Sequence, residues 1–172
     1  MQMLLDDNGV REAIERLARQ IEREIPPGAS IGVIGVRSRG DVLAARLIEV
    51  LRRDGFADVA HGALDITLYR DDLAEKGPTA VLQKTEIDFD ISNRYIILVD
   101  DVLYTGRSVR AALDAIVDLG RPIAIRLAVL VDRPGRELPI QADFVAVKVE
   151  QVNESVRVLL RETDGQDRVE VT

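Results

Sequence analysis

Residues 94–119 of this 172-residue chain, RYIILVDDVLYTGRSVRAALDAIVDL, constrain the fold more than any other stretch. The continuous apolar run at 96–99 is typical of a strand that is covered on both faces. Two carboxylates, Asp100 and Asp101, follow the predicted strand, and a turn of small residues then leads into a helix predicted over residues 108–119. A strand, a short turn and a helix in this order form the βα unit of a parallel sheet.

A second βα unit is predicted earlier in the chain. Residues 30–36, SIGVIGV, favour a short strand, which runs into Arg37-Ser38-Arg39-Gly40 and then a helix at about 41–54. Arginines in such a turn lie at the carboxyl end of a strand, which is the edge where open α/β sheets bind ligands. Further strands are predicted at 59–69 (with a bend near Gly62), at 123–131 and within 143–160. A first helix is predicted with Asp7 or Asn8 as its N-cap, and a polar tail is predicted after residue 160.

Length and composition indicate one domain with an aliphatic core. A chain of 172 residues with 47% apolar residues and only six aromatic ones fits this class. The absence of cysteine excludes disulfides, thiolate metal sites and cysteine nucleophiles. A net charge of −7 argues against a general nucleic-acid binder, although a local basic patch is compatible with it. The chain start lacks a secretory signal pattern and no apolar run reaches membrane length, so we expect a cytoplasmic protein.

The turn after the acidic pair has the groups that a phosphate requires. Backbone N–H groups at the start of a helix carry the positive end of the helix dipole. Gly106 permits a close approach of the chain to an anion, and the hydroxyls of Thr105 and Ser108 can add hydrogen bonds, with Ser108 also able to cap the helix. The two carboxylates upstream suit sugar hydroxyls or a divalent cation. Together these groups predict a site for a phosphorylated ribose.

Three other motifs fit this stretch less well. A Walker A loop ends in Lys-Ser/Thr, and Gly106-Arg107-Ser108 lacks the lysine. A dinucleotide fingerprint needs three spaced glycines, and this turn has one. A receiver domain has its acidic pair near the chain start and a phosphoacceptor aspartate on a later strand, whereas this pair lies past the middle of the chain.

Three segments resemble those of a known family. IILVDDVLYTGRSV is similar to the phosphoribosyl diphosphate motif of type I phosphoribosyltransferases. The bifunctional pyrimidine operon regulator/uracil phosphoribosyltransferase family is resembled more specifically by two other segments. These are DITLYRDDL at 65–73, and VDR at 131–133 followed by RELPI at 136–140. The resemblance implies a single domain over residues 1–172 with the α/β type I phosphoribosyltransferase fold. Its central, mostly parallel sheet would be flanked by helices, with a small hood mainly from 132–160 and a flexible lid at about 70–86.

The resemblance also implies an activity. Family members form UMP and diphosphate from uracil and 5-phosphoribosyl diphosphate with Mg²⁺, which is held through the substrate diphosphate. By this resemblance Arg39, Asp100 and Asp101 are expected to be catalytic, and the carboxylates to hold the ribose hydroxyls. The expected substrate-binding residues are Arg37, Ser38, Arg39 and Gly40 for the diphosphate; Thr105, Gly106, Arg107 and Ser108 for the 5′-phosphate; Asp132 and Arg133 for the uracil; and Val102, Leu103 and Tyr104 in the same stretch as the phosphate turn.

RNA binding is the point at which the chain departs from the family pattern. Relatives that attenuate transcription grip the pyrimidine operon mRNA leader with a basic surface, for which Arg19, Arg136 and Lys148 are the remaining candidates here. Basic positions expected within 141–152 are replaced, so we expect weakened RNA attenuation. The alternative is a UMP-sensing, RNA-binding regulator with little enzyme activity; a purine base is disfavoured by 65–73. Family resemblance suggests a homodimer or a higher homo-oligomer.

Overall fold

The structure is a computed structural model that describes residues 1–71 and 85–172. Its centre is a six-stranded sheet with the strands β2 (Ile31–Val36), β3 (Val59–Leu64), β4 (Glu86–Ile87), β5 (Tyr95–Leu103), β6 (Ala124–Asp132) and β7 (Phe144–Lys148). The strand order is β4-β3-β2-β5-β6-β7, and only the β3–β4 pair at the edge is antiparallel. The predicted mostly parallel central sheet is therefore confirmed.

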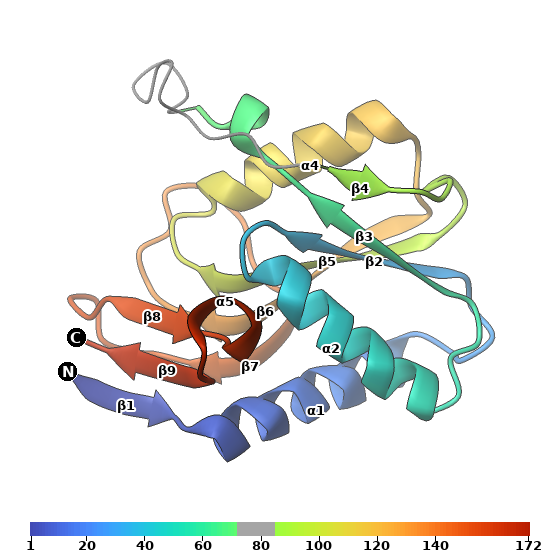
Figure 1. The fold of residues 1–172 in the computed structure, drawn as a ribbon. Coiled ribbons are helices and arrows are strands. Elements are labelled where there is room, and N and C mark those ends of the chain that lie inside the picture. The colour runs from blue at the N-terminus through green and yellow to red at the C-terminus, as the bar shows by residue number, and fades with distance from the viewer. Residues whose placement is uncertain (72–84) are drawn as a thin grey trace.

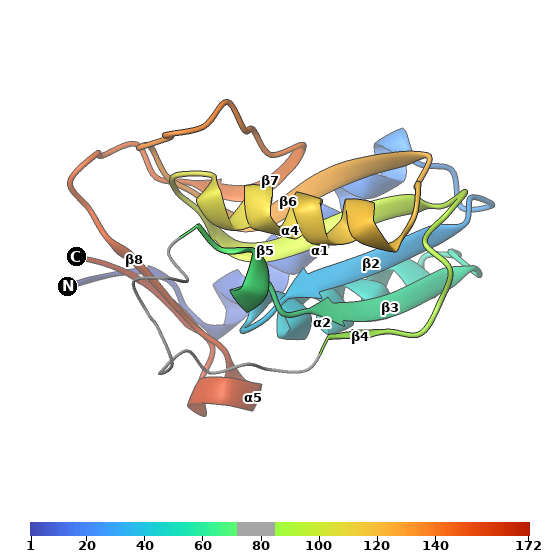
Figure 2. The ribbon, with the colours of Figure 1, turned by 90° about the horizontal axis from the view of Figure 1, so that it is seen from above.

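Helices cover both faces of this sheet. α1 (Asp7–Glu24) and α2 (Gly40–Arg53) lie on one face, and α4 (Arg107–Leu119) lies on the other (Figure 1; Figure 2). The alternation along β5 explains this arrangement, because Ile97 and Val99 pack among α1 and α2 whereas Ile96 and Leu98 pack among the residues of α4. A strand that is buried on both faces reads as a continuous apolar run, as predicted for 96–99.

The first helix begins slightly earlier than the sequence predicted. Asp6, rather than Asp7 or Asn8, is the N-cap, and its Oδ1 accepts a hydrogen bond of 2.8 Å from the backbone N–H of Gly9. This contact satisfies one of the N–H groups that the first helical turn leaves without an intrahelical partner. The buried residues of α1 recur at helical spacing and form one apolar stripe along the helix.

The two ends of the chain form a second, antiparallel sheet. It contains β1 (Gln2–Leu5), β9 (Arg168–Val171) and β8 (Val156–Leu159) in that order, with the short helix α5 (Arg161–Asp164) between β8 and β9. The termini consequently lie side by side (Figure 1). The predicted polar tail is wrong, because β9 is largely buried. Of the expected hood range 132–160, only β8 belongs to this sheet, and a hood role for it stays a prediction.

The region before the acidic pair also differs from the expectation. The strand predicted over 59–69 ends at Leu64, where the carboxylate of Asp65 accepts hydrogen bonds from the backbone N–H and the hydroxyl of Thr67, and a 3₁₀ turn (Thr67–Tyr69) follows. The expected lid at about 70–86 falls largely on residues 72–84, outside the described residues. No helix in the described part of the chain is long and apolar enough to cross a membrane.

Candidate active site

The two predicted loops meet at the carboxyl edge of the central sheet. β2 and β5 are neighbouring parallel strands, so the loop after β2 and the loop after β5 leave the sheet side by side. Gly40, the first residue of α2, lies so close to β5 that a Cβ atom there would be 2.6 Å from the carbonyl oxygen of Val99. The absence of a side chain at Gly40 thus brings Arg39 near the acidic pair.

Asp100 and Asp101 lie within β5 rather than after its end, because the strand continues to Leu103. Asp100 is 7% exposed, and its Oδ1 accepts a 2.9 Å hydrogen bond from the backbone N–H of Asp101. Burial, together with the negative charge of Asp101, raises the pKa of Asp100 well above its ordinary range. Burial also raises the pKa of Asp101, although hydrogen bonds and the charge of Arg39 act in the opposite direction. The pair is therefore costly to keep charged without a ligand.

The turn after β5 presents backbone donors at the start of a long helix. Gly106, and not Ser108, is the N-cap of α4, and it takes φ 92°, a left-handed conformation that suits glycine. No side chain caps this helix. Its first-turn N–H groups therefore point outward at the loop, apart from that of Arg107, which donates to Thr105 Oγ1 at 3.2 Å. Ser108 is exposed beside them. This geometry fits an anion.

Arg39 lies between the acidic pair and the C-terminal unit. It has φ 73°, which is uncommon for a residue with a side chain, and the peptide bond between Arg37 and Ser38 is cis. The guanidinium of Arg39 donates from Nε and Nη2 to the two carboxylate oxygens of Asp164, at 3.2 and 2.7 Å. This contact, and to a smaller extent the charge of Asp101, raises the pKa of Arg39. Asp164 had no role in the sequence-based prediction.

The two other arginines of the loops are also paired. Arg37 contacts Asp41 at 3.0 Å and Glu86 at 3.6 Å. Arg107 contacts Asp71 at 2.6 Å and lies 3.5 Å from Glu137. Arg107 thereby joins the start of α4 to the residue that precedes the undescribed segment.

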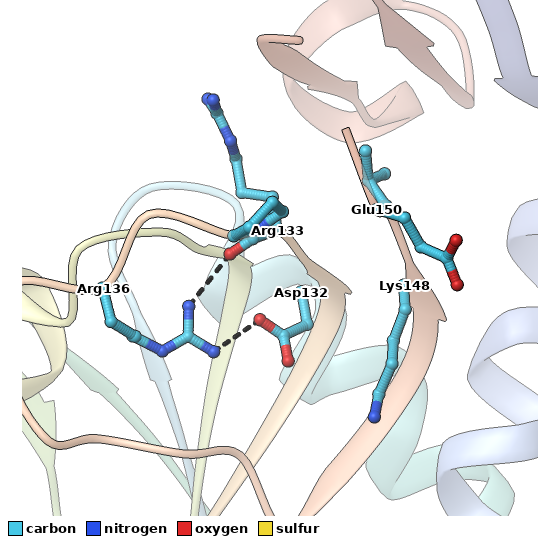
Figure 3. Close-up of a pocket in the computed structure, with 7 residues that line it drawn as sticks. Asp132, Arg133, Arg136, Lys148 and Glu150 are labelled. Carbon is cyan, nitrogen blue, oxygen red and sulfur yellow. Dashed lines mark hydrogen bonds and ion pairs between the residues drawn. The ribbon is translucent and has the colours of Figure 1, made fainter. Parts of the chain in front are cut away.

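A pocket of about 370 Å³ opens where β6 and β7 end. Figure 3 shows it with Asp132 and Lys148, which are register partners on these neighbouring strands. The guanidinium of Arg133 lies 3.9 Å from the centre of the Tyr104 ring, a cation–π contact with the turn after β5. Asp132 and Arg133 thus line a cavity, and through Tyr104 this cavity adjoins the turn. The lining is Asp132, Arg133, Pro134, Arg136, Lys148, Val149 and Glu150.

Arg136 is held inside this loop by four acceptors. Its guanidinium donates to the Asp132 carboxylate at 2.5 Å and to the backbone carbonyls of Ile140, Tyr104 and Arg133 at 2.7 to 3.0 Å. Figure 3 shows two of these contacts. Arg19 and Lys148, the other residues predicted to bind RNA, are exposed on α1 and β7, which pack together.

A preformed metal cage is absent from the described ranges 1–71 and 85–172, where no three histidine or carboxylate groups gather closely enough to hold an ion. The paired carboxylates of Asp100 and Asp101 are nevertheless hard oxygen donors of the kind that Mg²⁺ prefers.

Comparison with known proteins identifies the family of this chain. The family model described as a phosphoribosyl transferase domain matches residues 1–161. The chain belongs to the phosphoribosyl transferase family. It is 49% identical over 169 residues to the bifunctional protein PyrR of Deinococcus radiodurans, covering 98% of this chain and 92% of the relative, and 48% identical to the bifunctional protein PyrR of Thermus aquaticus, covering 98% and 93%.

Solved structures of the family share the fold. A hypoxanthine-guanine phosphoribosyltransferase from Bacillus anthracis matches with a TM-score of 0.71 and 25% identity, covering 91% of this chain and 86% of that one. The hypoxanthine phosphoribosyltransferase of Trypanosoma cruzi matches with a TM-score of 0.74 over 99% and 95% of the chains, and at 19% identity it supports the fold alone. The resemblance to the bifunctional regulator/phosphoribosyltransferase family and the predicted enzyme class are thus confirmed.

Proposed function

We propose that the protein forms UMP and diphosphate from uracil and 5-phosphoribosyl diphosphate at the carboxyl edge of β2, β5 and β6. The observation that carries this proposal is the close approach of Gly40 to β5, which brings the Arg37–Gly40 loop against the strand that carries the acidic pair; the uncapped start of α4 follows the same strand. An uncapped helix start suits a phosphate, and carboxylates suit sugar hydroxyls.

The donor sugar is bound from both sides of the turn. Its 5′-phosphate accepts hydrogen bonds from the backbone N–H groups of the turn 104–108, apart from that of Arg107, which donates to Thr105 Oγ1, and from the hydroxyls of Thr105 and Ser108. Its hydroxyl groups donate to the acidic pair. Asp101 is the better placed of the two, because it is half-buried whereas Asp100 lies almost wholly within the sheet. The carboxylate of Asp100 then supports Asp101 by accepting a hydrogen bond from its backbone N–H.

The loop from Arg37 to Gly40 meets the leaving diphosphate. Displacement at the anomeric carbon develops positive charge on the sugar and negative charge on the leaving group, so catalysis consists mainly of positioning and of stabilising that leaving group. Arg39 supplies a fixed positive charge for it. Residues fit for Mg²⁺ are present, since Asp100 and Asp101 offer hard oxygen donors beside the loop; the ion, when bound, neutralises charge on the diphosphate. The proposed chemistry requires no nucleophilic side chain.

The base is bound near the end of β6. Asp132 and Arg133 line the pocket there, and Arg133 lies against Tyr104 of the turn. We assign the uracil to this side of the turn because the other side is occupied by the diphosphate loop. Closure of the segment 70–86 over the bound substrates, a cytoplasmic location and a homo-oligomeric state remain predictions.

We further propose that RNA attenuation is weakened in this protein. Nucleic-acid affinity depends strongly on cations that contact phosphates. Of the three remaining candidates, Arg19 and Lys148 are exposed, whereas the guanidinium of Arg136 is bound by acceptors within the protein. Two of the three candidates are therefore left to contact RNA phosphates. A UMP-sensing, RNA-binding regulator with little enzyme activity is the alternative.

The proposed function is tested by identifying the nucleotide formed. The purified protein is incubated with Mg²⁺, 5-phosphoribosyl diphosphate and one nucleobase at a time. We expect UMP from uracil and little nucleotide from hypoxanthine or guanine. A purine nucleotide as the main product would overturn the base assignment, and no nucleotide from any base would overturn the enzyme assignment.

A further inference from the structure

Asp164 is tied to Arg39 by a two-point contact that crosses the molecule. The two residues are separated by 125 positions, and Asp164 belongs to α5, in the unit formed by the chain ends. Its side chain is 15% exposed. Besides the two bonds from Arg39, its Oδ2 accepts a 2.8 Å hydrogen bond from the backbone N–H of Leu160. The backbone of Leu160 therefore fixes the Asp164 carboxylate independently of its contact with Arg39.

A separate cluster fixes α5 against the side of α2. Arg46, in the second turn of α2, donates to Glu162 at 2.5 and 3.1 Å and to Asp167 at 2.8 and 2.9 Å. The C-terminal unit is thus attached to α2 at two places, once by Arg46 on the helix and once by Arg39 at the helix start. The unit is also joined to α1 by the ion pair of Arg161 with Asp7 and to β1 by the pairing of β9, so it has other attachments besides the Arg39 contact.

The geometry of the pair leaves Arg39 able to bind a second anion. A guanidinium carries five N–H donors, and Asp164 takes those of Nε and one from Nη2. In the described part of the chain Arg39 makes no other hydrogen bond, so the edge formed by Nη1 and Nη2 remains available. This edge can donate two parallel hydrogen bonds to one phosphate group.

We propose that Asp164 is a positioning residue, which fixes the plane of the Arg39 guanidinium so that its remaining edge meets the diphosphate. The proposal rests on the proposed function, since it concerns the same leaving group. Without Asp164, the side chain of Arg39 would be mobile. It would then lose rotamer freedom each time it bound the diphosphate. The C-terminal unit, through α5, thereby contributes to the site.

The test is the reverse reaction, in which UMP and diphosphate are separate substrates. In Asp164→Asn we expect the KM for diphosphate to rise roughly tenfold, as when a hydrogen bond to a charged group is lost, while the KM for UMP stays near the wild-type value. Asp164→Glu, which keeps the charge, should recover part of the loss. In an Arg39→Lys background the same Asp164→Asn change should have little further effect, because lysine cannot make the two-point contact.

Glu162→Gln is the matched control, since it breaks an ion pair of α5 that does not involve Arg39. Its KM for diphosphate should be unchanged. Equal behaviour of Asp164→Asn and Glu162→Gln would overturn the inference, as would a parallel rise of both KM values. If Asp164→Asn does not fold, Asp164→Glu carries the same comparison, and a wild-type KM for diphosphate in it would count against the inference. Failure of the wild type to form UMP would instead overturn the proposed function.

Discussion

Single residues at the sheet edge have roles that depend on their partners as much as on their chemistry. Arg39 has a positive φ, a conformation that costs about 1–3 kcal/mol for a residue with a side chain. Asp100 has a raised pKa because it is buried beside Asp101. Both observations are typical of sites at which the surrounding fold holds a residue in an unfavourable state for a function. The motif predicted these residues, but their burial and conformation came from the structure.

The hydrogen-bond partners of Arg136 argue against the RNA-binding role that the family pattern suggests for it. The family pattern suggested an RNA contact, whereas four acceptors on the 133–140 loop and its neighbours hold its guanidinium. A phosphate would have to compete with the Asp132 carboxylate for this group. No motif in the sequence indicates this set of contacts, three of which are with backbone carbonyls.

We therefore predict weak RNA binding. In a gel-shift assay with its own operon leader, the protein should bind with a Kd in or above the range of non-specific complexes, about 10⁻⁶ M or weaker at physiological salt. Lys148→Ala and Arg19→Ala should change this little. Tight binding that UMP strengthens would refute the prediction.

Among the elements, the start of α2 is the most sensitive to a change in volume. A Cβ atom at Gly40 would lie 2.6 Å from a backbone carbonyl oxygen of β5, so the helix would have to move away from the sheet. Gly40→Ala should destabilise the fold by about 1–3 kcal/mol, because this clash exceeds the usual gain of up to about 1 kcal/mol from alanine in a helix. Urea unfolding measures the change.

The matched control is Gly28→Ala, where a Cβ atom would meet nothing within 4 Å. We expect a stability change within about 0.5 kcal/mol. Equal effects of the two substitutions would show that α2 is not packed against β5 as described. Activity should fall in Gly40→Ala alone, since Arg39 moves with the helix.

The contact between α1 and the end of α2 should make stability depend on pH. Burial and a hydrogen bond to Asp54 raise the pKa of Glu22 from 4.5 to about 7, against the opposing charge of Arg53, and its Oε1 atom is buried without a hydrogen-bond partner. Between these two values the folded state binds more protons than the unfolded state. The free energy of unfolding therefore falls as the pH rises through this window.

Glu22→Gln should remove the part of this dependence that Glu22 contributes. We expect the variant to be more stable than the wild type at pH 8 by roughly 1 kcal/mol, after allowance for partial solvent exposure, and nearly equal to it at pH 4.5. Urea unfolding at both pH values tests this. Glu12→Gln, on the exposed face of α1, should leave the dependence unchanged. A wild-type stability that rises from pH 5 to 8 would contradict the assignment.

At the scale of the whole molecule, sequence patterns predicted the local βα units better than the long-range contacts. The apolar run at 96–99 and the turn after it identified β5 and α4 because their signals are continuous. β1 and β9 were missed because each has four residues and gains its stability from pairing across nearly the whole chain. The Arg39–Asp164 contact was missed for the same reason, since nothing local in residues 161–164 indicates a partner 125 positions away.

At this scale, the proposed activity requires the carboxyl edge of the central sheet to be the catalytic site. The most direct test is the rate of UMP formation from uracil in the wild type, Asp101→Asn, Arg39→Ala and the exposed control Asp88→Asn, with folding checked by circular dichroism. We predict that the two site variants lose on the order of 10²-fold or more in turnover while they stay folded, as when a charge-stabilising group is removed, and that the control keeps wild-type turnover. Unchanged turnover in both Asp101→Asn and Arg39→Ala would contradict the account.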